Sequence, residues 1–382
     1  MKVPVSRPFI GKEEEVLVNE ALKDGHISGT SGRFIKEFED GFAKYCGVKY
    51  GVAASSGTTA LHLALATLGI GPDDEVLTST FTNMATFKAA LYQQAKPIPI
   101  DIEPDTWNLD PKLLESKITP KTKAIMVVHI YGHPVDMDPV LEIAKKHNLK
   151  VIEDAAEAHG AEYLSAEALA KGDKGRKAGS LGDIGVFSFY ANKIITTGEG
   201  GMLVTNNKSY ADRARSLRSL AYGDENRFMH KDIGFNYRMT NLQAAIGCAQ
   251  LAKAEVVIKK KREMADFYNR AFEGIADLQL PVEKPYAKNV YWIYHVVLQG
   301  ALKGKRASII SALAEKGVET REAFVPYNMQ KLFIKKGMTE YDACPVANYV
   351  ALNGFYLPSG ADITKEELSY VADSLKAVIR EV

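Results

Sequence analysis

The 382-residue sequence has few cysteines and no excess of charge of either sign. Its three cysteines, Cys46, Cys248 and Cys344, are scattered, which argues against a disulfide framework and against a zinc site. The 48 basic residues balance 47 acidic ones, so the charge provides no attraction for nucleic acid or for an anionic membrane. No apolar run approaches the roughly 18 residues that span a bilayer, and no signal-like apolar core opens the chain. We therefore expect a cytoplasmic protein that binds neither nucleic acid nor membrane.

The length predicts two domains. Between about residues 40 and 205, short apolar runs alternate with helical periodicity, a pattern typical of βαβ units and a mainly parallel sheet. Strands are expected at 48–54, 75–80, 97–101, 123–130 and 150–153. Two further strands, at 184–190 and 202–205, are close enough in sequence to form an antiparallel pair. Residues 164–177 are rich in Ala, Lys and Gly and are expected to form a surface loop.

The character of the sequence changes after residue 205. A long helical stretch over 240–272 precedes a βα pattern with a strand at 291–298, a helix at 305–316 and a strand at 318–325. The pair Thr364 and Glu367 forms a capping box that opens the last helix. We therefore divide the chain into a large α/β domain, residues 1–255, and a smaller α+β domain, residues 256–382.

A helix in the first domain shows the expected terminal residues. Asp138 is expected to cap it, Pro139 to occupy its first turn and Asn148 to close it. Such a helix, placed between the strands at 123–130 and 150–153, supports a parallel crossover connection.

Candidate functional residues follow the predicted strands. Ligands of open α/β sheets bind outside the carboxyl ends of the strands. Asp154 follows one strand, Ser188 and Lys193 lie at the end of another, and Gly57 and Thr58 open a helix whose free N–H groups would favour a phosphate. Taken singly, each has an ordinary explanation as a turn, a helix cap or a surface lysine. Together, and in this order, they fit the chemistry of pyridoxal phosphate (PLP).

PLP chemistry needs three kinds of group. A lysine forms an imine with the cofactor aldehyde, and a carboxylate keeps the pyridine nitrogen protonated so that the ring accepts electrons. Backbone N–H groups and hydroxyls hold the phosphate. A nicotinamide-dependent sugar dehydrogenase would instead need a Gly-x-Gly-x-x-Gly turn after its first strand, which the sequence lacks.

Six short motifs carry a resemblance to a known family. They are Ser-Gly-Thr-Thr-Ala-Leu at 56–61, Ile-Glu-Asp-Ala-Ala-Glu-Ala at 152–158, Gly-Ser-Leu-Gly-Asp at 179–183, Ser-Phe-Tyr-Ala-Asn-Lys at 188–193, Thr-Gly-Glu-Gly-Gly at 197–201, and Gly-Phe-Asn-Tyr-Arg-Met-Thr-Asn at 234–241. In type and order they resemble the DegT/DnrJ/EryC1/StrS family of sugar aminotransferases, from about residue 10 to the C-terminus. The resemblance implies a fold-type I PLP enzyme (aspartate aminotransferase-like), with a mostly parallel seven-stranded sheet, a smaller C-terminal domain and a homodimer with shared active sites.

The resemblance also implies roles for individual residues. Lys193 corresponds to the Schiff-base lysine and Asp154 to the partner of the pyridine nitrogen. Ala156 would pack on one ring face, and Glu157 would lie near the ring hydroxyl. Lys193 further implies amino transfer, because relatives with histidine at this position are dehydratases.

The phosphate is expected to be held by residues of both subunits. The resemblance places Gly57, Thr58 and Ser188 on it from one subunit and Asn236 from the other. One position departs from the family pattern, since Asn83 stands where relatives carry an aromatic residue that stacks over PLP. Either Asn83 bonds over the ring or to substrate, which we favour, or the nearby Phe81 takes over the stacking.

The run over 192–202 is most similar to that of the perosamine synthases, which aminate C4 of GDP-4-keto-6-deoxymannose. The resemblance therefore implies L-glutamate as amino donor and a nucleotide-linked 4-keto-6-deoxy sugar as acceptor. A 3-keto or 4-keto sugar on dTDP or UDP remains an alternative. A PLP-dependent sugar dehydratase or lyase would share all cofactor residues. A sensory relative without turnover is expected to lack Lys193 or to carry a DNA-binding appendage, and neither feature occurs here.

Overall fold

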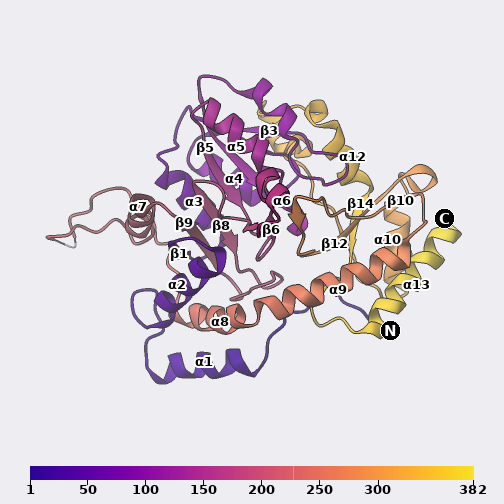
Figure 1. The fold of residues 1–382 in the computed structure, drawn as a ribbon, viewed down its shortest axis with the longest axis horizontal. Helices are drawn as coiled ribbons and strands as arrows, with labels where there is room; N and C mark the ends of the chain where they lie inside the picture. The colour runs from indigo at the N-terminus through magenta and orange to yellow at the C-terminus, as the bar shows by residue number, and fades with distance from the viewer. Residues whose placement is uncertain (227) are drawn as a thin grey trace.

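The computed structural model describes residues 1–226 and 228–382 and centres on a seven-stranded sheet (Figure 1). The strand order is β1-β9-β8-β5-β4-β2-β3. The strands are β1 (Tyr50–Ala54), β2 (Glu75–Ser79), β3 (Lys96–Ile100), β4 (Thr122–Val128), β5 (Lys150–Asp154), β8 (Ile184–Ser188) and β9 (Gly201–Thr205). Only β9 runs against its neighbours β1 and β8, and the other pairs are parallel. The predicted α/β class, mostly parallel sheet and antiparallel pair are confirmed.

Helices cover both faces of this sheet. Helices α2 (Phe34–Cys46) and α8 (Asn241–Ala252) pack with the side chains of Phe187 and Met202 on one face. Helices α3 (Gly57–Thr67) and α7 (Lys208–Arg218) pack with Val186 and Leu203 on the other. Strands buried on both faces read as continuous apolar runs, which is why β8 and β9 show no alternation with polar residues. Other helices of this part are α1 (Lys12–Lys23), α4 (Met84–Tyr92) and α5 (Met137–Lys146).

The long helix α9 (Ala254–Phe272) leads from the large sheet to the C-terminal part of the chain (Figure 1). There a four-stranded antiparallel sheet has the order β10-β12-β14-β13. Its strands are β10 (Leu278–Gln279), β12 (Tyr294–Leu298), β13 (Arg321–Glu322) and β14 (Gly354–Leu357). The accompanying helices are α10 (Arg306–Glu315), α11 (Lys331–Lys335), α12 (Pro345–Asn353) and α13 (Lys365–Glu381). The capping box of Thr364 and Glu367 opens α13, as predicted.

Both chain termini lie in this C-terminal part (Figure 1). The N–H of Val3 donates to the Gly317 carbonyl at 2.9 Å, and the N–H of Ser359 donates to the Val5 carbonyl at 2.8 Å. The Val3 side chain is buried with residues of α9 and β12. The N-terminal segment thus ties the C-terminal unit to α1 and the large sheet. The domain boundary at 255/256 stays a prediction.

Two expected elements were wrong in detail. Asp136, not Asp138, precedes α5, which ends at Lys146. Asn148 closes the helix as predicted, since it holds the left-handed backbone with φ of 54° and the N–H of Leu149 donates to the Ala144 carbonyl at 2.8 Å. Asp138 lies in the first turn, where its carboxylate accepts a hydrogen bond from the N–H of Ala166 at 2.8 Å. The strand expected at 318–325 is reduced to β13, because Val318 pairs with Val3 instead of with β14.

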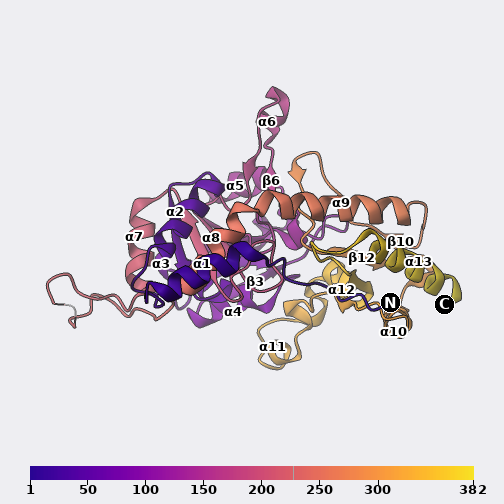
Figure 2. The ribbon, with the colours of Figure 1, turned by 90° about the horizontal axis from the view of Figure 1, so that it is seen from below.

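The expected surface loop at 164–177 has structure of its own. It contains α6 (Ala166–Lys171), flanked by β6 (Glu162–Tyr163) and β7 (Arg176–Lys177), which pair with each other and with β11 (Ala287–Lys288). Ser165 caps α6 through the N–H of Ala168, and Gly172 ends it with φ of 68°. These caps explain why a short helix forms here. It projects from the body of the molecule (Figure 2).

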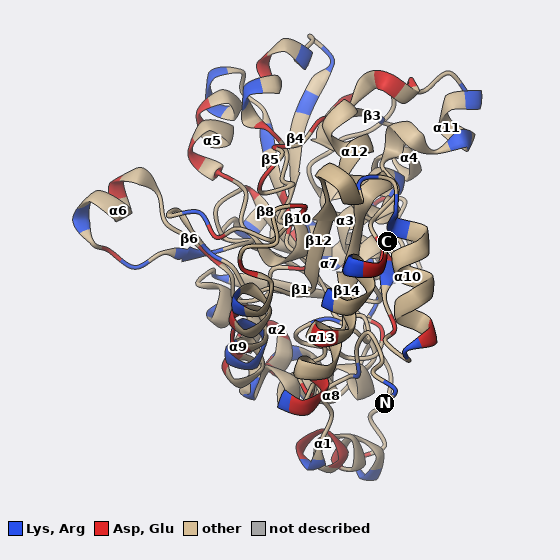
Figure 3. Ribbon diagram, turned by 90° about the vertical axis from the view of Figure 1, so that its right-hand side faces the viewer, with Lys and Arg blue, Asp and Glu red and all other residues tan. Residues whose placement is uncertain are grey.

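The surface mixes charges of both signs. Lys and Arg alternate with Asp and Glu along the outer helices (Figure 3). In the part of the chain that the structure describes, no helix is both long enough and apolar enough to cross a bilayer.

Candidate active site

A cavity of about 410 Å³ opens at the carboxyl ends of β5 and β8. Its lining includes eight of the nine predicted site residues: Gly57, Thr58, Asn83, Asp154, Ala156, Glu157, Ser188 and Lys193. Residues more than 130 positions apart in sequence therefore meet, because parallel strands bring their carboxyl ends to one edge of the sheet.

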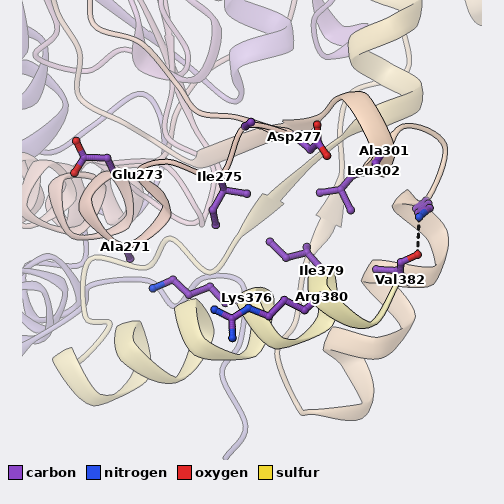
Figure 4. A pocket seen from close by; sticks show the side chains of 12 residues that line it. Ala271, Glu273, Ile275, Asp277, Ala301, Leu302, Lys376, Ile379, Arg380 and Val382 are labelled. Carbon is purple, nitrogen blue, oxygen red and sulfur yellow. Dashed lines mark hydrogen bonds between the residues drawn. The ribbon is translucent and has the colours of Figure 1, made fainter.

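A second cavity, of about 520 Å³, lies between the end of α9, residues 301–305 and α13 (Figure 4). Its lining is built from Ala271, Leu302, Ile379 and neighbouring residues near the C-terminus. None of the predicted site residues lines it. The chemistry predicted from the sequence therefore belongs to the cavity at β5 and β8.

One end of the β5–β8 cavity is the N-terminus of α3. Ser56 caps this helix by accepting the N–H of Thr59 at 3.1 Å. A Cβ atom on Gly57 would lie 2.7 Å from Cβ of Ser188, so only glycine allows this approach of helix and strand. The partial positive charge and free N–H groups of the helix N-terminus suit a phosphate.

Asp154, the last residue of β5, is buried and carries two hydrogen bonds. Its Oδ2 accepts from Oγ1 of Thr86 at 2.8 Å, and its Oδ1 accepts from the N–H of Ala156 at 3.2 Å. Burial nevertheless raises the pKa of Asp154. A cation in the cavity would stabilise the ionised form, as the protonated ring nitrogen of PLP would do.

Lys193 and Glu157 form a largely buried pair, with 10% and 5% of their side chains exposed. Nζ of Lys193 lies 3.8 Å from Oε1 of Glu157, whose Oε2 accepts the N–H of Tyr131 at 2.7 Å. Burial lowers the pKa of Lys193 below its ordinary value and raises the pKa of Glu157 to about 7. An amine with a lowered pKa is more often neutral, and the neutral amine is the form that attacks a carbonyl.

The motif at 179–183 supports the site indirectly, through hydrogen bonds to β5. Glu153, buried beside Asp154 in β5, accepts N–H bonds from Gly179, Leu181 and Gly182 at 2.6–2.7 Å. Nε2 of His129 lies 3.0 Å from Oε2 of Glu153. These bonds fix the loop before β8 against β5. The motif is therefore structural support for the residues at the strand ends.

Three aromatic residues that the sequence did not indicate line the opposite wall. They are Trp292, Phe324 and Tyr356, all from the C-terminal part of the chain. The ring centre of Trp292 lies 3.5 Å from Nζ of Lys193. The only available signal was the rarity of tryptophan, since Trp292 is one of two in the chain.

Asn83 lines the cavity, but its side-chain oxygen Oδ1 is engaged in a hydrogen bond. It caps α4 by accepting the N–H of Ala85 at 3.0 Å. Phe81 is fully buried, packs edge-on against Tyr131 with ring centres 5.9 Å apart, and is not part of the cavity wall. In this chain Phe81 is thus a core residue and does not take the place of a stacking ring at Asn83.

Asn236 is the predicted site residue that a single chain does not bring to the cavity. It is exposed and pairs with Ser219, and the described residues between them, 220–226 and 228–235, extend away from the body (Figure 1). Its predicted contact with the phosphate of a neighbouring subunit stays a prediction.

The residues fit PLP in character and placement. The α3 N-terminus with Ser188 suits the phosphate, Asp154 suits a cationic ring nitrogen, and the Lys193 amine lies in the same cavity. The absence of a side chain at Gly57 is needed for this cradle. When bound there, PLP supplies an aldehyde that links to amines and a ring that accepts electrons.

The comparisons with known proteins agree with this geometry. The family model for the DegT/DnrJ/EryC1/StrS aminotransferase family matches residues 8–376. The chain is 41% identical to the GDP-perosamine synthase of Caulobacter vibrioides, with 99% of this chain and 98% of that protein covered. It is 40% identical to the GDP-perosamine synthase of Escherichia coli O157:H7, with 98% and 97% covered. The solved structure of Spr1654 from Streptococcus pneumoniae in its PLP form matches with a TM-score of 0.92 at 26% identity, covering 100% of this chain and 99% of that one.

The fold, the cavity and these matches lead to one assignment. The predicted PLP cofactor, amino-transfer activity and fold-type I architecture are confirmed. The chain belongs to the DegT/DnrJ/EryC1/StrS aminotransferase family, and it is a PLP-dependent sugar aminotransferase.

Proposed function

We propose that the protein transfers the amino group of L-glutamate to C4 of a nucleotide-linked 4-keto-6-deoxy sugar, with GDP-4-keto-6-deoxymannose as the first candidate. The observation that carries the proposal is the buried amine of Lys193, 3.8 Å from Glu157 in the cavity that also contains Asp154. The identity of about 40% with two GDP-perosamine synthases supports the choice of sugar.

The residues of the cavity divide the work. Asp154 stabilises positive charge on the ring nitrogen, while Gly57, Thr58 and Ser188 hold the phosphate by N–H and hydroxyl groups. With PLP bound, the free amine of Lys193 would act as the general acid and base that takes a proton from the substrate carbon and returns it. Its lowered pKa favours the neutral form that accepts the proton.

We also infer a homodimer in which each subunit completes the other's site through Asn236. Residues 228–239 support this inference because they carry large apolar side chains in solvent: Phe228 is 79% exposed, Met229 68% and Ile233 87%. Exposed apolar clusters of this kind mark interaction surfaces. The free state of Cys46, Cys248 and Cys344 supports a reducing, cytoplasmic site of action.

The proposal is tested with a panel of nucleotide-linked keto-sugars on GDP, dTDP and UDP carriers. The purified enzyme receives L-glutamate and each sugar, and the amino-sugar product is identified by mass spectrometry and NMR. We expect the highest kcat/KM with the GDP-linked 4-keto-6-deoxy sugar and ping-pong kinetics. A higher kcat/KM with a dTDP- or UDP-linked sugar, or with a 3-keto sugar, would show that the proposed GDP-linked substrate is wrong. Loss of a sugar hydroxyl without amination would reject amino transfer.

A further inference from the structure

Four contacts hold Trp292 in place next to Lys193. Its backbone N–H donates to the Tyr131 carbonyl at 2.9 Å, and its indole Nε1–H donates to the carbonyl of Asn192 at 2.7 Å. Its own carbonyl accepts a hydrogen bond from Nζ of Lys261 at 3.0 Å. The fourth contact is the ring face itself, centred 3.5 Å from Nζ of Lys193. Every polar group of Trp292 is thus engaged, and the side chain is almost completely buried.

These contacts close a ring of interactions with Glu157. Lys193 lies beside Glu157, Glu157 accepts the N–H of Tyr131, and the Tyr131 carbonyl accepts the N–H of Trp292. Trp292 then returns to Lys193 through its ring face. Tyr131 and Tyr291 hold the left-handed backbone, with φ of 55° and 47°, which costs free energy for residues other than glycine. Such strain persists only where surrounding contacts enforce it.

Lys261 provides the anchor from outside the cavity. It lies in α9, is buried, and donates to the carbonyls of both Trp292 and Ser359. Burial lowers the pKa of Lys261 to about 7. Placing a lysine inside the protein is costly unless its hydrogen bonds are satisfied. Here both bonds go to backbone carbonyls at one end of the strand pair β12–β14, since Trp292 lies just before β12 and Ser359 just after β14.

We propose that Trp292 is a positioning residue for the reaction, whose ring face holds the free amine of Lys193 beside Glu157 whenever that amine is not joined to the cofactor. An aromatic face attracts the ammonium form, and the attraction is strongest in a desolvated site. The ring therefore gives the released lysine one resting place and raises its affinity for a proton. Lys261, through its hydrogen bond to the Trp292 carbonyl, keeps the ring in contact with Lys193. The inference uses the proposed function only for the role of Lys193.

The first test uses the full-length protein freed of cofactor. Trp107→Phe leaves Trp292 as the only tryptophan of the chain, so the emission reports on its ring alone. We expect the emission to change in one step as Lys193 loses its proton, because a neighbouring ammonium group perturbs the excited indole. The step should vanish when Lys193→Met is added. If the step persists in the Lys193→Met variant, or if no step occurs, the proposed contact between Trp292 and the Lys193 amine is wrong.

Other ionisable groups near the pair are separated by control variants. Glu157 and Asp154 act on Lys193 through charge, Lys193 acts on His159, and Tyr356 faces Glu157. Adding Glu157→Gln to the single-tryptophan protein identifies any step that belongs to the carboxyl group. The expected result is a step that still depends on Lys193 and moves to lower pH, because the Glu157 carboxylate stabilises the ammonium form of Lys193.

The second test measures the amine directly. Trace acetylation of the cofactor-free protein over a range of pH, with mass spectrometry of the Lys193 peptide, gives the pKa of that amine. We expect Trp292→Leu to lower the pKa by about one unit and Trp292→Phe by less, since phenylalanine keeps a ring face. Trp107→Phe, a buried tryptophan away from the cavity wall, should leave the pKa unchanged.

A purely structural role for Trp292 predicts a different pattern. The pKa of Lys193 would then be equal in Trp292→Leu, Trp292→Phe and the parent protein, and this result would overturn the proposal. If Trp292→Leu does not fold, Lys261→Met replaces it, because methionine keeps the apolar stem and removes the donor to the Trp292 carbonyl. A downward shift in the same direction supports the proposal, and an unchanged pKa rejects it. Neither the emission nor the pKa measurement uses a sugar substrate. Their outcome therefore does not depend on whether the proposed sugar is correct.

Discussion

Nζ of Lys193 lies 3.8 Å from Oε1 of Glu157 at the end of the sheet, and only 10% and 5% of the two side chains are exposed. Each group is harder to ionise than in water, yet each stabilises the charge of the other. The pair therefore links the proton on the reactive amine to the carboxyl group expected near the ring hydroxyl of PLP.

The first prediction concerns the pH dependence of stability. Burial raises the pKa of Glu157 from 4.5 to about 7, so the unfolded chain loses this proton before the folded one does. The protonated carboxyl group contributes its full stabilisation below about pH 4.5. The free energy of unfolding then falls by up to about 3 kcal/mol as the pH rises to about 7. Denaturant unfolding of the cofactor-free protein should show this decline relative to Glu157→Gln. Parallel pH profiles for the two proteins would contradict it.

The second prediction is that Lys193 carries the cofactor. Borohydride treatment of the yellow protein should attach PLP to the peptide containing Lys193, as seen by mass spectrometry. Lys193→Ala should keep the parent's circular dichroism and lose both colour and turnover, because no other amine replaces it in the cavity. A label on another lysine would show that the assignment is wrong.

The third prediction concerns Asp154. Asp154→Asn should retain the covalent link to PLP and lose most of the turnover, because a neutral amide no longer stabilises a protonated ring nitrogen. Hydrogen bonds to an ionised group are roughly twice as strong as neutral ones in a dry site. Steady-state kinetics and the absorbance of the bound cofactor separate the two effects. Turnover close to that of the parent enzyme would exclude the electron-sink role.

The fourth prediction tests the shared active site. Asn236→Asp should weaken PLP binding, because its carboxylate would lie beside the phosphate of the neighbouring subunit. Mixing Asn236→Asp with Lys193→Ala subunits places both lesions in one site of the mixed dimer and none in the other. We expect partial recovery of activity after subunit exchange. No recovery, with exchange verified by native mass spectrometry, would remove Asn236 from the neighbour's site.

The fifth prediction separates Asn83 from Phe81. Asn83→Tyr should still bind PLP and alter turnover of the keto-sugar, since Asn83 lines the cavity. Phe81→Ala should cost about 3–5 kcal/mol of stability, because the ring is fully buried against Tyr131. PLP titration and thermal unfolding measure both. Loss of PLP binding by Phe81→Ala with the fold intact, together with an unchanged Asn83→Tyr, would reverse the two roles.

The sequence by itself determined the large sheet and the residues at its carboxyl edge. Gly57, Asp154 and Lys193 each lie within a short motif next to a strand, and parallel pairing brings such positions to one edge. Local periodicity and caps were sufficient because neighbours along the chain set these elements. Where a distant segment competed, as Val3 does at Val318, the local pattern gave the wrong strand length.

Only the tertiary structure decided the opposite wall of the cavity. Trp292 follows Lys193 by almost one hundred residues, and nothing in its neighbourhood in the sequence indicates a contact with the amine. That contact depends on how α9 and the four-stranded sheet pack against the large sheet, and on the bond from Lys261 to the Trp292 carbonyl. Close packing between distant segments is a property of the whole fold, so side chains that meet only through it leave no periodic signal in the sequence.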